Sequence, residues 1–325
     1  MPTMNRRRAL QRLGTSVAAI AAPMAFAQDR TVRLLVGVPP GGGTDAIARL
    51  LAEKLKDELH ANVIVENKAG AGGQLAAQAL KAAAPDGNTL FLTHDHTVSI
   101  LPLVVKSPGF DPSQDFVPVA GFASFANALA LSGGTPAKSV AEYVGWVKGA
   151  GGGKGAVGVP APASVPEFLV KVLGEKFGLD LVPAPYRGSA PMMADMLGNQ
   201  IAAGIGSIPD FIENHKSGKL RVVAVMGSAR QAALPDVPTL AEVGVAGFEE
   251  LPYYGLFAPA GTPKAAIDGT AAALAKVIAL TDVKDRLTAM GLAVGAMGPA
   301  QLGARERAYT ATWARIIKAS GFQPQ

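Results

Sequence analysis

The stretch Val32-Arg-Leu-Leu-Val-Gly-Val-Pro-Pro-Gly-Gly-Gly-Thr44 decides the fold class of this chain. Its first seven residues are mostly apolar and include several β-branched side chains, a pattern typical of a buried strand. From Thr44 onward the apolar residues follow a helical period and share one face. They are Ile47, Leu50, Leu51, Leu55 and Leu59. A strand that passes through a glycine-rich turn into an amphipathic helix is half of a β-α-β unit.

The same alternation recurs along the chain, apart from a connecting stretch over 101–126. Further strands are predicted over 63–66, 89–93, 156–159, 179–182, 201–205 and 220–226. Helices are predicted over 74–83, 137–148, 166–177, 190–197, 265–280, 283–290 and 300–319. Right-handed crossovers place the strand-to-helix loops at the carboxyl edge of a parallel sheet. The sequence therefore predicts an α/β protein with two units, each a mainly parallel sheet with flanking helices.

Length and composition exclude several classes of protein. A chain of 325 residues is long for one core, so we expect two domains. With 49% hydrophobic and 17% charged residues, the chain is not intrinsically disordered. It has no cysteine, which excludes disulfide scaffolds, thiolate metal sites and cysteine nucleophiles.

The net charge of +5 is concentrated at the N-terminus. Residues 1–27 contain Arg6, Arg7, Arg8 and Arg12, no acidic residue, a short apolar stretch and the tripeptide Ala-Phe-Ala27. This layout predicts a cleaved signal peptide over 1–27, and the arginines resemble a twin-arginine signal. Removing four of the 30 basic residues leaves 26 against 25 acidic ones, a net charge of +1. We therefore expect a periplasmic protein that does not bind nucleic acid.

The loop 41–43 is the first candidate binding site. Glycines allow close backbone approach, and the N–H groups at a helix start attract an anion. Residues 41–46 also match the G-x-G-x-x-A form of the dinucleotide fingerprint, with Glu66 where a ribose-binding acid would lie. Alternatively, Thr44 or Asp45 simply caps the helix. An anion site, a nucleotide site and a structural cap all remain open.

Two more loops repeat this arrangement. The loop 70–73 follows the second strand, and two adjacent helix N-termini suit a small anion with more than one charge. The loop 160–164 follows a strand of the second unit, where Ser164 is either a helix cap or a hydrogen-bond donor to the ligand. None of the glycine runs continues into Lys-Ser or Lys-Thr, which excludes a P-loop.

Three side chains after strands carry further hypotheses. His94 and His96 share one face if the segment is extended, so they line a pocket, make structural hydrogen bonds, or bind a metal with a third ligand. Arg187 either pairs with a carboxylate or lies on the surface. The chain contains no Gly-x-Ser-x-Gly, Ser-x-x-Lys or His-Glu-x-x-His motif, so nothing supports an enzyme.

Seven motifs in sequence order resemble those of a known family, the Bug or TctC-like solute receptors of tripartite tricarboxylate transporters. The resemblance covers essentially all of the mature chain. The motifs are Pro39-Pro-Gly-Gly-Gly-Thr-Asp45, Val65-Glu-Asn-Lys-Ala-Gly-Ala-Gly-Gly73, Pro85-Asp-Gly-Asn-Thr-Leu90, Asp115-Phe-Val-Pro-Val119, Pro185-Tyr-Arg-Gly188, Leu234-Pro-Asp-Val-Pro-Thr-Leu-Ala-Glu242 and Tyr254-Gly-Leu-Phe-Ala-Pro-Ala-Gly-Thr-Pro263.

The resemblance implies a two-domain periplasmic-binding-protein fold of the Venus flytrap, type II-like kind. Domain 1 is expected over 28–124 and 228–325, and domain 2 over 125–227. It further implies a monomer without catalysis or cofactor that binds a small carboxylate between the domains. The ligand is then presented to membrane subunits of the transporter or to a sensor protein. The alternatives are a nucleotide-dependent oxidoreductase built on 41–46 and a metal receptor using His94 and His96.

The expected ligand-binding residues come from two sources. Those placed by motif position are Pro40, Gly41, Gly42, Gly43, Gly72, Gly73, Ala163, Ser164 and Ser207. Those placed by their position after strands are His94, His96 and Arg187.

Overall fold

The computed structural model describes residues 30–319 and 322–324. The chain divides into a unit of residues 1–30 and a unit of residues 31–325, and only the second is treated below. The expected signal peptide over 1–27 lies outside the described residues. Among the helices of the described part, none is both long enough and apolar enough to cross a membrane.

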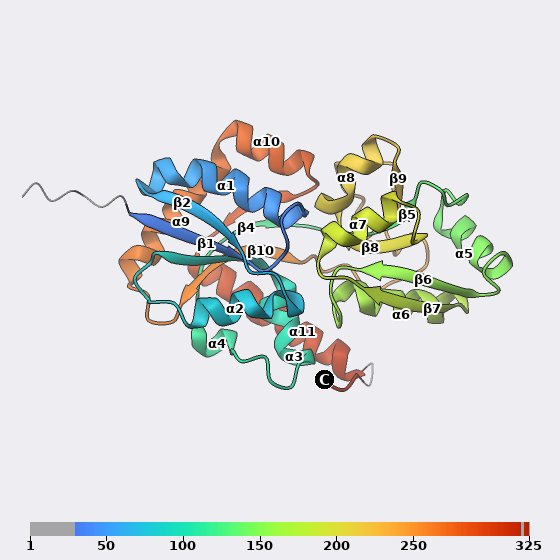
Figure 1. Ribbon diagram of the computed structural model, residues 1–325, viewed down its shortest axis with the longest axis horizontal. Coiled ribbons are helices and arrows are strands. Elements are labelled where there is room, and N and C mark those ends of the chain that lie inside the picture. Colours follow the sequence, from blue (N-terminus) through green and yellow to red (C-terminus); the bar gives the residue numbers. More distant parts are fainter. Residues whose placement is uncertain (1–29, 320–321, 325) are drawn as a thin grey trace, which may run out of the picture. The chain divides into compact units, whose positions relative to one another are not determined.

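The first sheet has six strands in the order β11-β4-β10-β3-β1-β2 (Figure 1). β1 pairs in parallel with β2 and with β3, as the β-α-β pattern predicts. β10 then inserts antiparallel between β3 and β4, and β11 extends the sheet beyond β4. The strand bounds are β1 (Thr31–Val36), β2 (Asn62–Asn67), β3 (Thr89–His94), β4 (Phe116–Ser124), β10 (Tyr253–Pro259) and β11 (Ala293–Met297).

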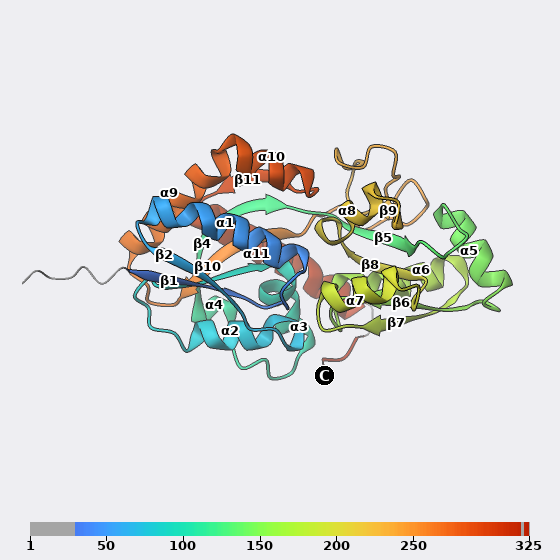
Figure 2. The same ribbon diagram turned by 45° about the horizontal axis from the view of Figure 1, so that its top comes forward.

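Helices cover both faces of this sheet (Figure 2). α1 (Gly43–Leu59), α9 (Lys264–Ala279) and α10 (Thr281–Ala289) share one core, in which Ile47 and Leu51 of α1 are buried with Leu34 of β1. α2 (Gln74–Lys81) and α11 (Pro299–Ala319) contribute to the other core, together with Leu35 and Phe91. Alternate residues of β1 thus enter opposite cores, as the two-residue period of a strand requires.

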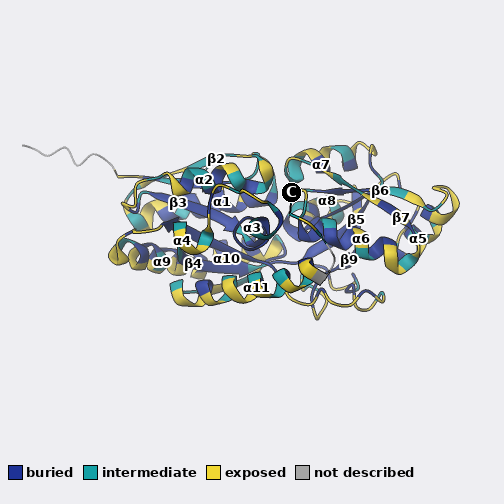
Figure 3. Cartoon of the chain, turned by 90° about the horizontal axis from the view of Figure 1, so that it is seen from below, coloured by how far each residue is buried: buried dark blue, intermediate teal, exposed yellow. Residues whose placement is uncertain are grey.

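The second sheet has five strands in the order β7-β6-β8-β5-β9. Its strands are β5 (Asn127–Ser132), β6 (Lys154–Val159), β7 (Asp180–Pro185), β8 (Ala203–Ser207) and β9 (Leu220–Val225). Its helices are α5 (Val140–Gly149), α6 (Val165–Phe177), α7 (Ser189–Leu197) and α8 (Ile208–Lys216). The central strands of both sheets are mostly buried, whereas the edge strands β2, β7 and β11 are largely exposed or half-buried (Figure 3).

The α/β class is confirmed, but the sheets are mixed where mainly parallel sheets were expected. The first has two parallel and three antiparallel strand pairs, and the second has two of each. The reason is that β10 and β5 each enter their sheet between strands formed by other parts of the chain. All strands of the second sheet lie within 127–225, and the division into domains at 28–124 with 228–325 and 125–227 stays a prediction.

The stretch 101–126, expected to be a connection, contains regular structure. It holds two single-turn helices, α3 (Leu101–Val104) and α4 (Pro112–Asp115), followed by β4. Pro118 and Gly121 interrupt the strand pattern of β4, and the register with β10 shifts near both positions. Two short segments of tighter or wider helix, η1 (Ala71–Gly73) and η2 (His96–Ile100), follow β2 and β3.

Candidate functional site

A cavity of about 350 Å³ lies where strand-to-helix loops of both sheets meet. The first sheet contributes 37–39, 70–72 and 94–96, which follow β1, β2 and β3. The second sheet contributes 160–162, 164–166, 185–189 and the start of α8. The volume is within the range of roughly 300–1,000 Å³ that is usual for small-molecule sites. The carboxyl-edge rule therefore locates this cavity correctly.

Half of the residues expected to bind ligand line this cavity. These six are Gly72, His94, His96, Ser164, Arg187 and Ser207. Three others, Pro40, Gly73 and Ala163, lie in the same loops without lining it. The remaining three, Gly41, Gly42 and Gly43, line a second cavity of about 330 Å³ beside α7, α8 and α10.

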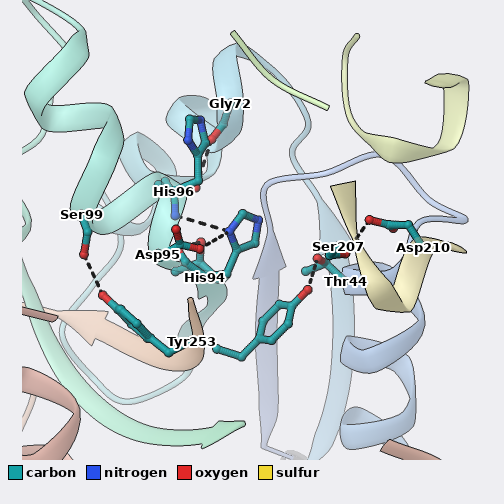
Figure 4. A network of polar contacts seen from close by, with 12 residues as sticks. Thr44, Gly72, His94, Asp95, His96, Ser99, Ser207, Asp210 and Tyr253 are labelled. Atoms are coloured by element: carbon teal, nitrogen blue, oxygen red, sulfur yellow. Dashed lines mark hydrogen bonds and ion pairs between the residues drawn. The ribbon is translucent and has the colours of Figure 1, made fainter. Parts of the chain in front are cut away.

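The N-terminus of α1, one expected anion site, holds the carboxylate of Asp210. Figure 4 shows Asp210 and its bond to Ser207. The Gly43 N–H donates to Oδ1 of Asp210 at 2.8 Å. The hydroxyls of Ser189 and Ser207 donate to Oδ2 of Asp210 at 2.8 and 2.5 Å. Both serines, like Asp210, belong to the second sheet or its helices, so among these three bonds to Asp210 the one from Gly43 joins the two sheets.

The neighbouring acids of the glycine loop are also engaged. Asp45 accepts from the Gly41 N–H at 3.0 Å and pairs with Arg49, while the helix cap itself is Gly42, without a side-chain bond. Glu66, the acid that the nucleotide hypothesis needs, forms a two-bond pair with Arg33 at 2.6 and 2.9 Å. Hydrogen bonding from Arg33 lowers the pKa of the Glu66 carboxyl. The carboxylates of Asp45 and Glu66 are thus both bonded to other groups of the protein.

The segment after β3 places a polar group against an aromatic wall. Nδ1 of His94 lies 3.2 Å from Oδ1 of Asp95. The His94 ring meets Phe125 and Tyr254 edge-on, with ring centroids 5.8 and 5.7 Å apart. Tyr254 in turn bonds Thr44 through its hydroxyl at 2.9 Å. His94 is thereby fixed at the cavity wall by contacts on two sides.

His96 is buried, with 6% of its surface exposed. Neither of its ring nitrogens has a hydrogen-bond partner among the described residues. Burial, followed by the influence of His94, lowers its pKa to about 4, so the ring is neutral at pH 7. A side chain on Gly72, whose φ is +66°, would place its Cβ 2.6 Å from Nε2 of His96. Glycine at 72 therefore makes room for this imidazole.

The metal hypothesis for His94 and His96 finds no third ligand nearby. Their ring centroids are 6.4 Å apart. Within residues 30–319 and 322–324, no three His, Cys, Asp or Glu side chains are grouped closely enough to hold a metal ion.

Arg187 and Ser164 enter the cavity from the second sheet. Arg187 is exposed, and its guanidinium makes no hydrogen bond or ion pair with the described residues. It is also the only Lys or Arg among the described residues that line the cavity. Ser164 is the N-cap of α6, accepting from the Glu167 N–H at 3.4 Å and donating to the Ala161 carbonyl at 2.7 Å. Ser164 was expected to be either a helix cap or a hydrogen-bond donor to the ligand, and the structure shows the cap.

Sequence reasoning missed Asp210. The segment Ser207-Ile-Pro-Asp210 carries the signals of a helix start, because a serine N-cap is followed by proline and then by an acid in the first turn. Those signals would have revealed α8. They would not have revealed the bond to Gly43, which joins residues 167 positions apart.

Comparisons with known proteins add an independent line of evidence. A family model described as "Tripartite tricarboxylate transporter family receptor" matches residues 47–322. Protein BugT of Bordetella pertussis is 34% identical over 264 residues, covering 80% of this chain and 81% of BugT. The structure of the periplasmic binding protein BugD matches with TM-score 0.86 and 31% identity, covering 91% of this chain and 99% of BugD. A structure from R. palustris with adipate matches with TM-score 0.86 and 27% identity, covering 92% of this chain and all of the other.

Proposed function

Because this chain belongs to the receptor family of tripartite tricarboxylate transporters, we propose that it captures a small organic acid between its two sheets and presents it to the membrane subunits of such a transporter, or to a sensor protein. The family is one of periplasmic solute receptors, and its relative BugD is a periplasmic binding protein. We further propose that this chain is exported with the signal over 1–27, acts as a monomer and has no catalytic role. The adipate bound to the R. palustris neighbour supports a carboxylate as the ligand.

The unpaired guanidinium of Arg187 carries the proposal. A cation without an internal partner, at the wall of a cavity of about 350 Å³, is a natural partner for a carboxylate. Arginine can hold a carboxylate through two parallel hydrogen bonds, which fixes the orientation of the ligand as well as binding it. We therefore propose that the carboxylate binds on the second sheet's side of the cavity.

Closure of the two sheets around the ligand would report its presence. Loops from both sheets line the cavity, so a ligand that touches both binds the closed arrangement better and shifts the population toward it. The bond from Gly43 to Asp210 also joins the two sheets, and it favours the closed arrangement before ligand arrives. A membrane partner can then distinguish the two arrangements.

Two measurements test this function. Mass spectrometry of the natively purified protein should find a bound organic acid, and calorimetry should then give its Kd. Arg187→Gln should raise that Kd by about 10- to 100-fold, since a hydrogen bond to a charged group contributes about 1.5–3 kcal/mol. Arg315→Gln changes the same charge on α11 away from the cavity and should leave the Kd as it is. A dinucleotide or a metal ion recovered in place of an acid would refute the proposal.

A further inference from the structure

The cavity wall formed by the first sheet is rich in hydrogen-bond acceptors. Asp95 is 3% exposed and lines the cavity, where Nδ1 of His94 lies 3.2 Å from its Oδ1 and the hydroxyl of Tyr309 is a second neighbouring donor. An ionised carboxylate accepts about four hydrogen bonds and donates none. Asp95 therefore has accepting capacity left, in contrast to Asp210, which already receives three donors.

His96 lies beside Asp95 and is also incompletely bonded. Its neutral ring offers one N–H donor and one nitrogen acceptor, and neither is used by the described residues. A buried polar group without a partner costs about 1–3 kcal/mol, so such groups in folded proteins call for an explanation. Since His96 lines the cavity, a polar group of the ligand is the partner that its position provides for.

The charges around the cavity differ between the two sheets. Arg187 lies on a loop of the second sheet, whereas Asp95 lies on a loop of the first. A ligand with a carboxylate at each end would satisfy Arg187 but would bring its second carboxylate to Asp95, where like charges repel. A ligand whose other end donates hydrogen bonds avoids this repulsion and satisfies Asp95.

The wall between these polar groups is largely apolar or aromatic. Phe125 and Tyr254 lie on the first sheet's side, and Pro160, Pro162 and Pro166 on the second sheet's side. Such a wall favours an apolar body between the two polar ends of the ligand.

We infer that the ligand is a small carboxylic acid with an apolar body and a hydrogen-bond donor group, a hydroxyl or an ammonium, which Asp95 and His96 bind. This inference rests on the proposed function, because it takes the carboxylate at Arg187 as given. Asp95 and His96 then select among acids of equal size, while Arg187 binds the feature that all of them share.

Matched ligands test the inference on the unmodified protein. One set is 3-phenylpropanoate, 3-phenyllactate and phenylalanine, which share a carbon skeleton and carry no donor, a hydroxyl and an ammonium. A second set is 4-methylpentanoate, 2-hydroxy-4-methylpentanoate and leucine. Calorimetry should show at least tenfold tighter binding of a donor-bearing member over the member without a donor in at least one set. The member that binds best tells hydroxyl from ammonium.

A variant of Asp95 tests whether the preference for donor-bearing acids comes from the first sheet's side of the cavity. Asp95→Asn should reduce the ratio of the two Kd values to less than about threefold, because an amide accepts less strongly and introduces its own donors. Asp285→Asn, on the exposed surface of α10, should preserve the ratio. Should Asp95→Asn not fold, the ligand ratios on the unmodified protein decide the matter alone.

The outcomes separate the two claims. If the acids without a donor bind as tightly as their partners, or more tightly, the inference about the donor is wrong while the proposed function stands. If none of the six acids binds and the purified protein carries no organic acid, the proposed function falls, and the inference with it. If selectivity persists unchanged in Asp95→Asn, Asp95 is not its origin and the inference is again refuted.

Discussion

Replacing Asp210 by asparagine tests whether its carboxylate couples the two sheets. The variant keeps the shape of the side chain and an oxygen that can accept from the Gly43 N–H, but it removes the negative charge. Ser189 and Ser207 hold that charge in place from the second sheet, so the loss at Gly43 is the part that concerns closure.

The magnitude follows from the bond between Gly43 and Asp210, which crosses between the sheets. A hydrogen bond to a charged group contributes about 1.5–3 kcal/mol and a neutral one about 0.5–1.5, so the substitution costs about 1 kcal/mol at Gly43. Loss of a negative charge at the N-terminus of the 17-residue helix α1 costs about 0.3–1 kcal/mol more. The closed arrangement should therefore become less favourable by about 1.5–2 kcal/mol, or roughly 10- to 30-fold.

Two assays measure the loss of closure in Asp210→Asn. The Kd of the recovered acid should rise by up to the same factor, because the ligand must now also offset the weaker closure. The radius of gyration from X-ray scattering should increase without ligand and return to the unmodified value at saturation. Glu213→Gln is the matched control, since it lies on the same helix, is 77% exposed and does not bond α1.

Either of two results would refute the reasoning. An unchanged Kd together with an unchanged radius of gyration would show that the bond to Gly43 does not influence closure. Tighter binding by Asp210→Asn would show instead that the carboxylate of Asp210 competes with the ligand for the N-terminus of α1.

Three further changes give sharp expectations. Gly72→Ala should weaken acid binding at least tenfold and lower the Tm, because its Cβ would lie 2.6 Å from Nε2 of His96 at a φ of +66°. Ser164→Ala should cost about 1 kcal/mol in denaturant unfolding, as the loss of an N-cap does. His96→Asn should flatten the pH dependence of stability between 6.5 and 4. The unfolded chain takes up a proton near 6.5 and the folded protein only at about 4, so the unmodified protein loses up to about 3 kcal/mol as pH falls through this window.

Each of these has its own control. Gly269→Ala, in α9 with open space around its Cα, should bind acid normally, and normal binding by Gly72→Ala would argue against contact with His96. Ser113→Ala, on an exposed turn, separates a cap effect from a general loss of a hydroxyl. For His96, the same pH dependence of stability in His96→Asn as in the unmodified protein would mean that the imidazole titrates normally or that its burial is incomplete.

The carboxyl-edge rule predicted the position of the cavity because it depends on local chemistry. A buried strand, a glycine turn and an amphipathic helix are each visible in a short window. His94 and Ser207 end their strands, and Arg187 lies two residues beyond β7. Chain direction alone then brings these residues to one edge. The same reasoning needed no knowledge of which strands are neighbours.

What the sequence did not reveal depends on contacts between distant segments. Gly43 is diverted from the ligand by Asp210, and the sheets are mixed because β10 pairs with β3 and β4. Nothing within the window around Tyr253–Pro259 tells which strands it joins, since a fully buried strand reads as a uniform apolar run. The prediction therefore located most of the loops that line the cavity and the β1–β2 and β1–β3 pairs, but it missed β4, β5, β10 and β11 as strands.

The late arrival of β10 has a consequence for how the chain folds. β3 and β4 both need β10 as a neighbour, yet roughly 160 residues separate the end of β3 from the start of β10. At roughly 5–20 residues per second, synthesis would leave the edges of β3 and β4 that face β10 unpaired for roughly 6–30 seconds. Unpaired edges are templates for aggregation, so the first sheet depends on protection until its last third emerges. The second sheet, made from one continuous stretch, can form meanwhile.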